Sequence, residues 1–578
     1  MSEINLKVNG IDVSVPKGTT VMSAAKLAGV EIPSLCYLRE VSAIASCRIC
    51  VVEIKGRKGL TASCVLPAEE GMEVFTNTKN VRDARKGNLE LLLSDHNKKC
   101  LSCVRSTSCE LQELSREYGV DEDKYPNSGI RYEIDNSSEY VVRDNNKCIL
   151  CRRCVSACVQ MQSVDAIGAI DRGHGTHIGC AFERNLENSP CVGCGQCIVA
   201  CPVGALSEKN HEKQVWDAIS DPNKRVVMFT APSVRAQIGE AFGMPIGTNA
   251  ESQMIAASRR LGFDAVFNMD VTADLTIVEE ANELVDRVSN GGVLPMFTSC
   301  CPGWVKFAEH NYPEMLPNLS TCKSPQQMFG ALLKSYYCEQ ENIDPKDLYV
   351  VSVIPCTAKK FEAKRGEQHW RDDQDVDVAL TTRELAHMIK EAAIQFETLD
   401  GEDFDNPFEC GSGAGTIFGA SGGVMEAALR TAGRIIDPTF DKVEIDEVRG
   451  TKGIKKATYK MGSLEVKVAV VSGLANARKL MKEIEEGKED FHMIEVMACP
   501  GGCVNGGGQI IPRDKVRNNI DVRTERAKVL YKIDDGDKYR VSHETPTITK
   551  IYDEFLGKPG HGKAHELLHT TYVKREKL

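Results

Sequence analysis

Two copies of one cysteine pattern constrain the fold of this chain more than any other feature. "CILCRRCVSAC" at 148–158 and "CVGCGQCIVAC" at 191–201 both have the spacing C-x2-C-x2-C-x3-C. Chains with two such runs bind a pair of 4Fe–4S clusters, and the fourth cysteine of each run ligates the other cluster. The sequence therefore predicts one cluster on Cys148, Cys151, Cys154 and Cys201, and a second on Cys191, Cys194, Cys197 and Cys158.

The cellular context decides how the other cysteines are interpreted. The chain has 578 residues, 24 cysteines and a net charge of -11. It begins "MSEINLKVNG", without the basic and apolar regions of a secretory signal, and it has no apolar run of about 18 residues that would span a membrane. We therefore expect a cytoplasmic chain, where grouped cysteines bind metal more often than they form disulfides. The acidic charge argues against nucleic acid as a general partner.

A first cysteine group lies near the N-terminus. Its members are Cys36, Cys47, Cys50 and Cys64. Four thiolates suit a 2Fe–2S cluster, and zinc is the alternative. "LKVNGIDVSV" alternates apolar and polar residues around Asn9-Gly10, which predicts a β-hairpin. The group resembles the ferredoxin-like domain at the start of the large iron–sulfur subunit of complex I, so we expect a β-grasp domain over residues 1–80.

A second group follows in "DHNKKCLSCVRSTSC". It contains His96, Cys100, Cys103 and Cys109. Three thiolates and one imidazole fit zinc as well as a cluster, but the position between other iron–sulfur groups favours a His-ligated 4Fe–4S cluster over residues 81–125. The two-run region then occupies 126–209. Four closed clusters on 16 ligands transfer electrons without bond chemistry, so this part of the chain is interpreted as a relay to another site.

Residues 210–578 follow a different pattern. Apolar segments such as "RVVMFTAP", "LYVVSVIPC" and "VKVAVVSG" alternate with amphipathic stretches, which predicts a large α/β domain with mostly parallel strands after the α+β relay domains. Three cysteine motifs follow apolar runs: "TSCCPGW", "PCTAKKFE" and "MACPGGCVNGGGQ". Because sites form beyond the carboxyl ends of strands in such sheets, we expect these cysteines to meet. A four-ligand cube would then leave one of the adjacent cysteines spare.

These three motifs, in this order after a cluster-rich region, resemble the iron–iron (FeFe) hydrogenases in their monomeric, multi-cluster clostridial form. The resemblance covers the whole chain and implies an H-cluster. Its 4Fe–4S cube would be held by Cys301, Cys356, Cys499 and Cys503, with Cys503 bridging to a two-iron subcluster that carries CO, cyanide and an azadithiolate. Cys300 is then implied to be a proton-relay thiol, whose ordinary pKa of about 8.5 suits proton exchange. A small buried core residue is the alternative.

The rest of a proton path is expected on a helix over residues 272–288. Glu280, Glu283 and Arg287 lie on one face of that helix. A solvated charged face is the alternative for such a row. The resemblance assigns Glu280, Ser320, Glu283 and Arg287, in that order, to the family's proton path.

The resemblance also assigns residues to the subcluster pocket. Lys359 is expected to donate to a cyanide, because a buried ammonium needs an anionic partner, and an ordinary surface lysine is the alternative. The other pocket positions are Pro232, Ser233, Gln326, Ile354 and Met497. Ile354 departs from the family, which usually has methionine there, so we expect altered tuning or inhibitor response.

Three other features receive no catalytic role. "HELLH" would place His565 and His569 on one helical face, but no third zinc ligand is evident nearby. The glycine-rich segment 410–423 lacks the spacing of a nucleotide loop, and we interpret it as close packing near the cluster. The ungrouped cysteines are interpreted as structural: Cys180, Cys322, Cys338 and Cys410. Cys322 lies two residues past Ser320, so its neighbourhood is a candidate functional region.

The sequence therefore predicts reversible interconversion of protons and electrons with H2. We expect a monomer that exchanges electrons with a ferredoxin or flavodoxin-like carrier and receives its two-iron subcluster from maturation proteins. An iron–sulfur assembly scaffold is one alternative, but it would not be expected to keep Cys300 with Glu280 and Glu283. A hydrogen sensor would usually carry a signalling domain, and an electron-transfer subunit would not need the C-terminal motifs.

Overall fold

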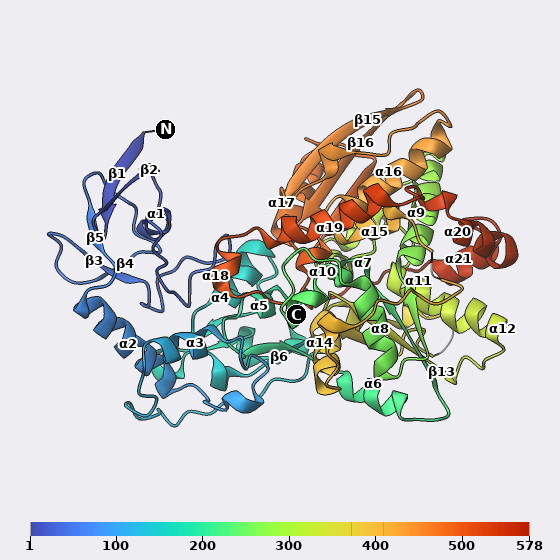
Figure 1. The fold of residues 1–578 in the computed structure, drawn as a ribbon. Helices are drawn as coiled ribbons and strands as arrows, with labels where there is room; N and C mark the ends of the chain where they lie inside the picture. Colours follow the sequence, from blue (N-terminus) through green and yellow to red (C-terminus); the bar gives the residue numbers. More distant parts are fainter. Residues whose placement is uncertain (1, 371–372, 409, 577–578) are drawn as a thin grey trace.

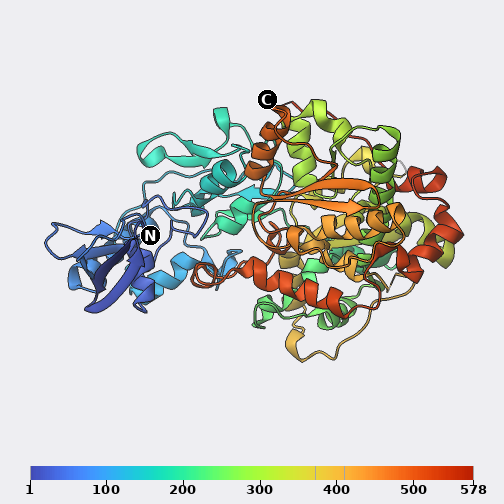
Figure 2. The same cartoon turned by 90° about the horizontal axis from the view of Figure 1, so that it is seen from above.

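The computed structural model describes residues 2–370, 373–408 and 410–576. An N-terminal lobe of small domains lies at one end, and a larger α/β lobe occupies the other (Figures 1 and 2). Within these ranges, no helix has both the length and the apolar character needed to cross a membrane.

The N-terminal domain is built on a mixed five-stranded sheet with the order β2-β1-β5-β3-β4. Asn9 and Gly10 have φ values of 50° and 87°, the left-handed conformation that a tight hairpin turn needs. β1 pairs antiparallel with β2 on either side of them, which confirms the predicted hairpin. The elements are β1 (Glu3–Val8), β2 (Ile11–Pro16), α1 (Val21–Leu27), β3 (Val51–Ile54), β4 (Thr61–Ala62) and β5 (Glu73–Phe75).

The remainder of the N-terminal lobe has little regular structure and packs around cysteines. One apolar core contains Cys36, Leu89 and Cys151, so the three cysteine-rich regions share a packed interior. Strands β6 and β9 pair antiparallel and bracket both repeated runs. The elements are α2 (Lys79–Ser94), α3 (Glu110–Glu117), β6 (Val141–Arg143), α4 (Arg153–Ser156), β7 (Gly168–Ile170), β8 (His177–Gly179), α5 (Gln196–Ala200) and β9 (Leu206–Glu208).

Two four-stranded sheets form the larger lobe. The order β11-β10-β13-β14 is parallel throughout, whereas β12-β17-β16-β15 is parallel except for the β15–β16 hairpin. Strands that are covered on both faces are buried along almost their whole length. In β10, "RVVMFT", every residue after Arg225 is buried. The strands are β10 (Arg225–Thr230), β11 (Ala265–Asn268), β12 (Met296–Phe297), β13 (Leu348–Ile354), β14 (Val378–Thr381), β15 (Ile454–Met461), β16 (Leu464–Ser472) and β17 (Met493–Met497).

Helix α9 (Asp270–Asn290) joins the cores of the two sheets. Leu275 belongs to the core of the first sheet, and Ile277 belongs to that of the second. The helix ends at Gly291, whose φ of 72° suits a C-terminal cap. The other helices of the lobe are α6 (Glu212–Ile219), α7 (Pro232–Arg235), α8 (Glu251–Leu261), α10 (Pro302–Asn311), α11 (Pro325–Leu332), α12 (Cys338–Glu341), α13 (Lys359–Glu362), α14 (Thr382–Glu391), α15 (Gly413–Thr416), α16 (Gly423–Ile436) and α17 (Leu474–Glu485).

The glycine-rich segment 410–423 packs its backbone tightly against helices α9 and α7, in agreement with the close packing that the sequence predicts. A β-carbon on Gly415 would lie 2.5 Å from Asp270 O, and one on Gly419 would lie 2.9 Å from Ser233 Cβ. Neither position has room for a larger residue. The segment therefore fixes α15 against α9 and α7.

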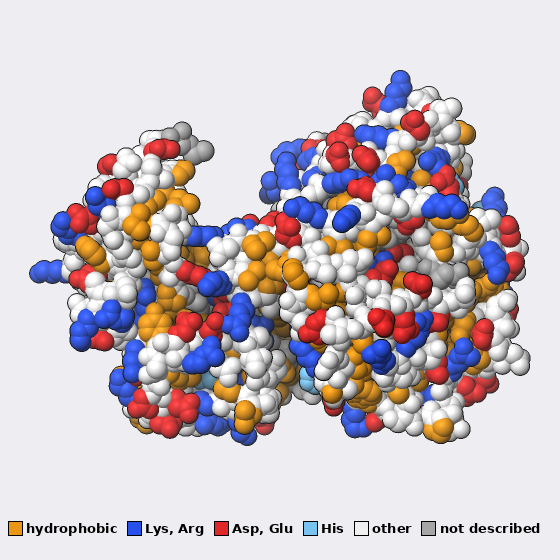
Figure 3. Space-filling model, viewed as in Figure 1, with side chains coloured by type: hydrophobic (Ala, Val, Ile, Leu, Met, Phe, Trp, Pro, Cys, Tyr) orange, Lys and Arg blue, Asp and Glu red, His pale blue; other side chains and the backbone are white. Residues whose placement is uncertain are grey.

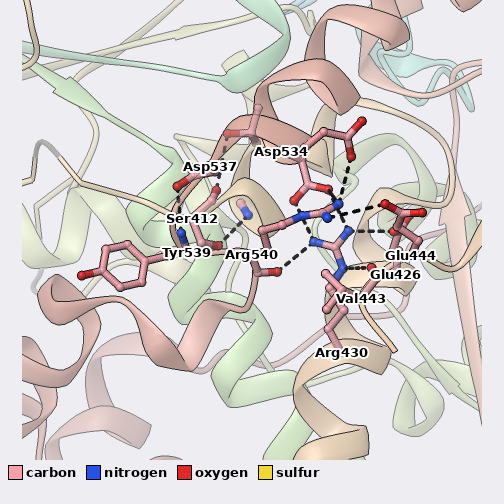
Figure 4. Close-up of polar contacts among 12 residues, drawn as sticks. Ser412, Glu426, Arg430, Val443, Glu444, Asp534, Asp537, Tyr539 and Arg540 are labelled. Atoms are coloured by element: carbon pink, nitrogen blue, oxygen red, sulfur yellow. Dashed lines mark hydrogen bonds and ion pairs between the residues drawn. The ribbon is translucent and has the colours of Figure 1, made fainter. Parts of the chain in front are cut away.

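The C-terminal segment wraps the larger lobe, in Figure 1 from near α4 to the far side. It comprises α18 (Asp514–Arg517), α19 (Val522–Gly536), α20 (Pro546–Ile551) and α21 (Gly562–Leu568). The fully buried Arg430 of α16 holds it, donating to both carboxylate oxygens of Asp534 at 2.8 Å and to Glu426 at 2.7 Å (Figure 4). Arg540 also donates to Asp534. Buried charges of this kind need such complete pairing.

Candidate active site

One cavity in the larger lobe collects the cysteines that follow β12, β13 and β17, and it encloses about 650 Å³ of space not filled by protein atoms. Since β12 and β17 belong to one sheet and β13 to the other, it lies where carboxyl ends of strands from both sheets meet. Its cysteines are Cys300, Cys301, Cys356, Cys499 and Cys503. The structure therefore brings together the five thiols that are distant in the sequence.

Cys300 and Cys301 are adjacent but have different surroundings. Cys301 precedes α10, and its Sγ accepts a hydrogen bond from the Ala498 N–H at 3.4 Å. Burial raises the pKa of Cys300 well above that of an ordinary thiol, and the Glu280 carboxylate adds to the increase. The expectation of an ordinary thiol pKa was therefore wrong for this buried site. The Lys359 ammonium acts in the opposite direction and lowers the pKa of Cys300.

A row of polar groups leads from Cys300 along α9. Glu280 is fully buried, and within the described residues neither of its carboxylate oxygens has a hydrogen-bond partner. Burial and the nearby Glu283 raise its pKa to about 8, so it keeps its proton at neutral pH. Ser320 Oγ donates to Glu283 Oε2 at 2.9 Å, and Arg287 Nη2 donates to Glu283 Oε1 at 2.6 Å. Full burial of Glu280 excludes a solvated charged face at that position.

Lys359 reaches the cavity from the start of α13. Its Nζ donates to Glu362 Oε2 at 2.7 Å and to Cys300 O at 3.2 Å. Burial alone would lower the pKa of Lys359, but the Glu362 carboxylate raises it above the usual value, so the ammonium stays charged. A surface lysine is excluded. Glu362 is an anionic partner that sequence reasoning missed, although its i,i+3 spacing was a usable signal.

Five pocket residues were expected, and four of them line the cavity: Pro232, Ser233, Ile354 and Met497. Ser233 Oγ is buried without a hydrogen-bond partner among the described residues. Since buried hydroxyls normally have a partner, this atom marks a place for a bound group. Gln326, the fifth, does not line the cavity. Its Nε2 donates to Glu362 Oε2 at 3.1 Å.

Two smaller cavities hold the cysteines of the repeated runs. They enclose about 380 and 460 Å³. The first is lined by Cys148, Cys151, Cys154 and Cys201, and the second by Cys158, Cys191, Cys194 and Cys197. Each set combines three cysteines of one run with the fourth of the other, which is the exchange that the spacing predicts.

The second of these cavities adjoins the large five-cysteine cavity, which we call the catalytic cavity, through two glycines, Gly195 and Gly507. A β-carbon on Gly195 would lie 2.5 Å from Thr357 Oγ1 and 2.7 Å from Gly507 Cα. Thr357 Oγ1 also donates to Gly193 O at 2.6 Å. Cys194 lies close enough to Cys499 to raise the pKa of the Cys499 thiol. Sequence reasoning missed this junction, whose only signal was "CVNGGGQ".

The two N-terminal groups differ in how far their donors are brought together. The thiols of Cys47 and Cys64 hydrogen-bond to Cys36 and lower its pKa. His96 is buried, which lowers its pKa to about 4 and keeps the imidazole neutral, the form that binds metal. Its Nδ1 has no hydrogen-bond partner in the described part of the chain. The first donor set therefore fits a bound cluster, and His96 has a neutral imidazole nitrogen suited to a metal.

The "HELLH" residues are arranged differently from the expected helical pair. α21 ends at Leu568, so His569 lies just beyond the helix. The two imidazoles stack with centroids 4.8 Å apart. His569 turns inward, where its Nε2 lies 3.0 Å from Glu279 Oε2.

Cysteine-lined cavities that lead to a larger cysteine-lined cavity beside a buried acid row define an iron–sulfur oxidoreductase with an internal relay. Family models match the chain in the same order. Residues 1–79 match a 2Fe-2S cluster binding domain, 85–124 the NADH-ubiquinone oxidoreductase-G iron-sulfur binding region, and 138–207 the ferredoxin-like domain of NADH-quinone oxidoreductase subunit 3. Residues 224–507 match the C-terminal domain of the iron only hydrogenase large subunit, and 520–575 match the iron hydrogenase small subunit.

Full-length relatives agree with these matches. The NADP-reducing hydrogenase subunit HndD of Solidesulfovibrio fructosivorans is 46% identical over 100% of both chains. Iron hydrogenase 1 of Clostridium pasteurianum is 43% identical over 98% of this chain and 99% of its own. A structure of [FeFe]-hydrogenase HydA1 from Chlamydomonas reinhardtii is 40% identical, covers 63% of this chain and 99% of that chain, and gives a TM-score of 0.57. The chain belongs to the iron-only (FeFe) hydrogenases in their multi-cluster form, and it interconverts H2 with protons and electrons.

Proposed function

We propose that one 2Fe–2S cluster and three accessory 4Fe–4S clusters carry electrons to an H-cluster in the large cavity. Cys301, Cys356, Cys499 and Cys503 would hold the cube, and Cys503 would bridge to a two-iron subcluster with CO, cyanide and azadithiolate ligands. When bound, that subcluster supplies the iron at which H2 is formed or split. The observation that carries this proposal is the convergence of five cysteines with the unpartnered Ser233 Oγ and the charged Lys359.

The protein residues around the subcluster position and polarise it. Lys359 directs an ammonium toward the cavity, and Glu362 keeps that ammonium charged, so an anionic cyanide would find a fixed positive partner. The apolar wall, with Ile354 and Met497, excludes bulk water and strengthens this interaction.

Protons would move between the cavity and the surface through Cys300, Glu280, Ser320, Glu283 and Arg287. The Glu280 carboxyl, with a pKa of about 8, can hold a proton at neutral pH and release it at little cost, as a relay acid must. Ser320 already hydrogen-bonds to Glu283, so the outer half of the path is connected. Glu283 and Arg287 are 14% and 12% exposed and form the solvent end.

The electron partner is expected to bind the relay lobe. Of the 17 large apolar side chains that are exposed among the described residues, 12 lie before residue 183, although that region is about a third of the chain. Leu101 and Val104, 101% and 65% exposed, stand beside the His96 cysteine group. Orange side chains are visible over the same lobe in Figure 3. Such a concentration marks a protein interface.

Two kinds of partner fit this surface. A ferredoxin or flavodoxin-like carrier is the first. The second is a nicotinamide-binding subunit, which is favoured by the likeness to HndD, named as a subunit of an NADP-reducing hydrogenase. Purification of the chain with its native partners, followed by assay with reduced ferredoxin and with NADPH, distinguishes them. The monomeric state, the cytoplasmic location, the need for maturation proteins and the division at residues 80, 125 and 209 stay predictions.

Replacement of Cys300 tests the proposed mechanism. In matured protein, Cys300→Ser should lower H2 evolution on the order of 10²- to 10⁴-fold, the range that a lost general acid contributes. Iron content and the infrared bands of CO and cyanide should stay unchanged. The buried Cys338→Ala variant is the matched control, since Cys338 does not line the cavity that holds the five cysteines. Retained turnover in Cys300→Ser would exclude the relay role, and absent infrared bands in the parent protein would favour an assembly scaffold.

A further inference from the structure

Three potential metal ligands of different types meet beside the outer end of the proton path. Glu283, Cys322 and His569 each offer one ligand atom, and these atoms all lie within 4.8 Å of one another. Glu283 comes from α9, and Cys322 lies three residues before α11. His569 follows α21 and forms an isolated β-bridge with Cys322. A thiol, an imidazole and a carboxylate are the ligands that a tetrahedral zinc ion uses, with the fourth position left to water.

The imidazole is already held as in a zinc site. His569 Nε2 lies 3.0 Å from Glu279 Oε2, and Glu279 is itself fixed by Tyr552 Oη at 2.5 Å and by the Gly560 N–H at 2.6 Å. A carboxylate behind a metal-binding histidine orients the ring and makes it more basic. Among the described residues, the other ring nitrogen, Nδ1, forms a hydrogen bond only with the Thr321 hydroxyl, at 2.7 Å. This nitrogen is the one left for a metal.

The carboxylate of Glu283 is shared between the proton path and this cluster. Its Oε1 accepts from Arg287, while its Oε2 lies 3.8 Å from Cys322 Sγ. The ionisable groups that face these three ligands among the described residues are Glu279, Glu280, Arg287, Tyr552 and Tyr572. Even without Glu280, which keeps its proton at neutral pH, the Glu279 and Glu283 carboxylates outnumber the Arg287 guanidinium, so a divalent cation is favoured electrostatically. The partly exposed Glu283–Arg287 pair is the entry route.

We propose that Glu283, Cys322 and His569 form a site for Zn²⁺, and that the bound metal inhibits the enzyme by occupying the carboxylate that would otherwise pass protons. The Cys322 S–H bond breaks as the Zn–S bond forms, and the released proton goes to buffer. A sulfur ligand selects Zn²⁺ over Mg²⁺ or Ca²⁺, which prefer oxygen. The proposed zinc binding depends only on the geometry of Glu283, Cys322 and His569. The proposed inhibition depends also on the proposed proton path.

The first experiment measures binding in fully cluster-loaded protein, because empty cluster sites would also take zinc. With one equivalent of Zn²⁺, zinc-edge X-ray absorption should show one sulfur at about 2.3 Å and nitrogen or oxygen neighbours at about 2.0–2.1 Å. The sulfur contribution should vanish in Cys322→Ala and persist in the control Cys338→Ala. Absence of the sulfur neighbour in the parent protein would overturn the site.

The second experiment measures inhibition of H2 evolution by added Zn²⁺. Glu279→Gln should raise the half-inhibiting zinc concentration roughly 10- to 100-fold, the usual effect of losing a partner behind a metal ligand. Cys322→Ala and His569→Gln should raise it further, Cys338→Ala should not change it, and a chelator should restore turnover with iron content unchanged. If Cys322→Ala or His569→Gln does not fold, the same measurement on the other variant tests the site.

The outcomes separate this proposal from the proposed function. Zinc bound through sulfur with inhibition that depends on Cys322 supports the proposal. Zinc bound through sulfur without inhibition overturns the inhibitory role and shows that proton transfer does not depend on Glu283. If the parent protein without zinc evolves no H2, the proposed function fails, while X-ray absorption still decides whether the metal site exists.

Discussion

The backbone of Gly195 lies directly against the backbone of Gly507, with no space for a side chain on either residue. A β-carbon on Gly507 would lie 2.6 Å from Gly195 Cα. Gly195 belongs to the second repeated run, and Gly507 follows the last cysteine motif of the catalytic cavity. This contact therefore links the relay directly to the proposed H-cluster site, and the close approach explains why both positions are glycine.

Gly507→Ala is predicted to separate the relay from the catalytic cavity. The added methyl group must displace the Cys194 carbonyl, Gly195 or Thr357, at a cost of about 1–3 kcal/mol for overpacking. H2 evolution driven by a protein carrier should fall severalfold, while evolution driven by a small viologen dye should fall less. Gly536→Ala is the control, since a β-carbon there meets no atom within 4 Å. Equal rates for Gly507→Ala and the parent with the protein carrier would show that electrons take another route.

Glu280→Gln is predicted to remove a pH dependence of stability. The folded-state pKa of Glu280 is about 8, above its ordinary 4.5, because of burial and Glu283. Its stabilising contribution is therefore complete below about pH 4.5 and is lost as the pH rises through 8, at about 1.4 kcal/mol per pH unit. Calorimetry should show equal melting temperatures for parent and variant near pH 5, and a higher one for the variant near pH 9.

The same variant should also lose activity, because glutamine cannot pass a proton. The expected decrease in H2 evolution is on the order of 10²- to 10⁴-fold. Glu465→Gln, at an exposed glutamate of β16, is the matched control for both measurements. A Glu280→Gln melting temperature that follows the parent across the whole pH range would contradict the buried, protonated carboxyl.

Ile354→Met is predicted to change catalytic tuning with little effect on stability. Ile354 is 3% exposed and lines the catalytic cavity, and a swap of similar volume usually costs less than about 1.5 kcal/mol. A polarizable thioether in place of a branched aliphatic group alters the surroundings of the subcluster. Film voltammetry should detect a change in catalytic bias or in CO inhibition. If both stay the same, this position does not tune the site.

Arg430→Met is predicted to loosen the C-terminal segment. It removes the donor that joins Glu426 to Asp534 in a fully buried cluster (Figure 4). Breaking a buried ion pair costs about 3–5 kcal/mol, partly offset here by Arg449 and Arg540. Limited proteolysis should release fragments from the region 520–575 faster than in the parent. Lys482→Met, which breaks an exposed pair with Glu486, should have almost no effect.

The sequence predicted the elements with strong local patterns. The hairpin at Asn9-Gly10 and the long helix that carries Glu280 are both present, because turn chemistry and helical periodicity are local properties. The pairing of strands into two sheets was not predictable, since apolar runs carry no information on which neighbour they select. The raised pKa of Cys300 was not predictable, because it depends on burial by distant segments. The pairing of Glu362 with Lys359 was missed although its i,i+3 spacing is local.

The sequence by itself determined the chemistry: cysteines at fixed spacing set which residues can hold clusters, because ligand type and separation along the chain restrict the geometry. Only the tertiary structure decided how those ligands work together. It placed Gly195 against Gly507, buried Glu280 until its pKa rose to about 8, and brought His569 beside Cys322 from residues far apart in the sequence. Burial and contact between distant segments set the electrostatic environment of each group, and these are properties of packing.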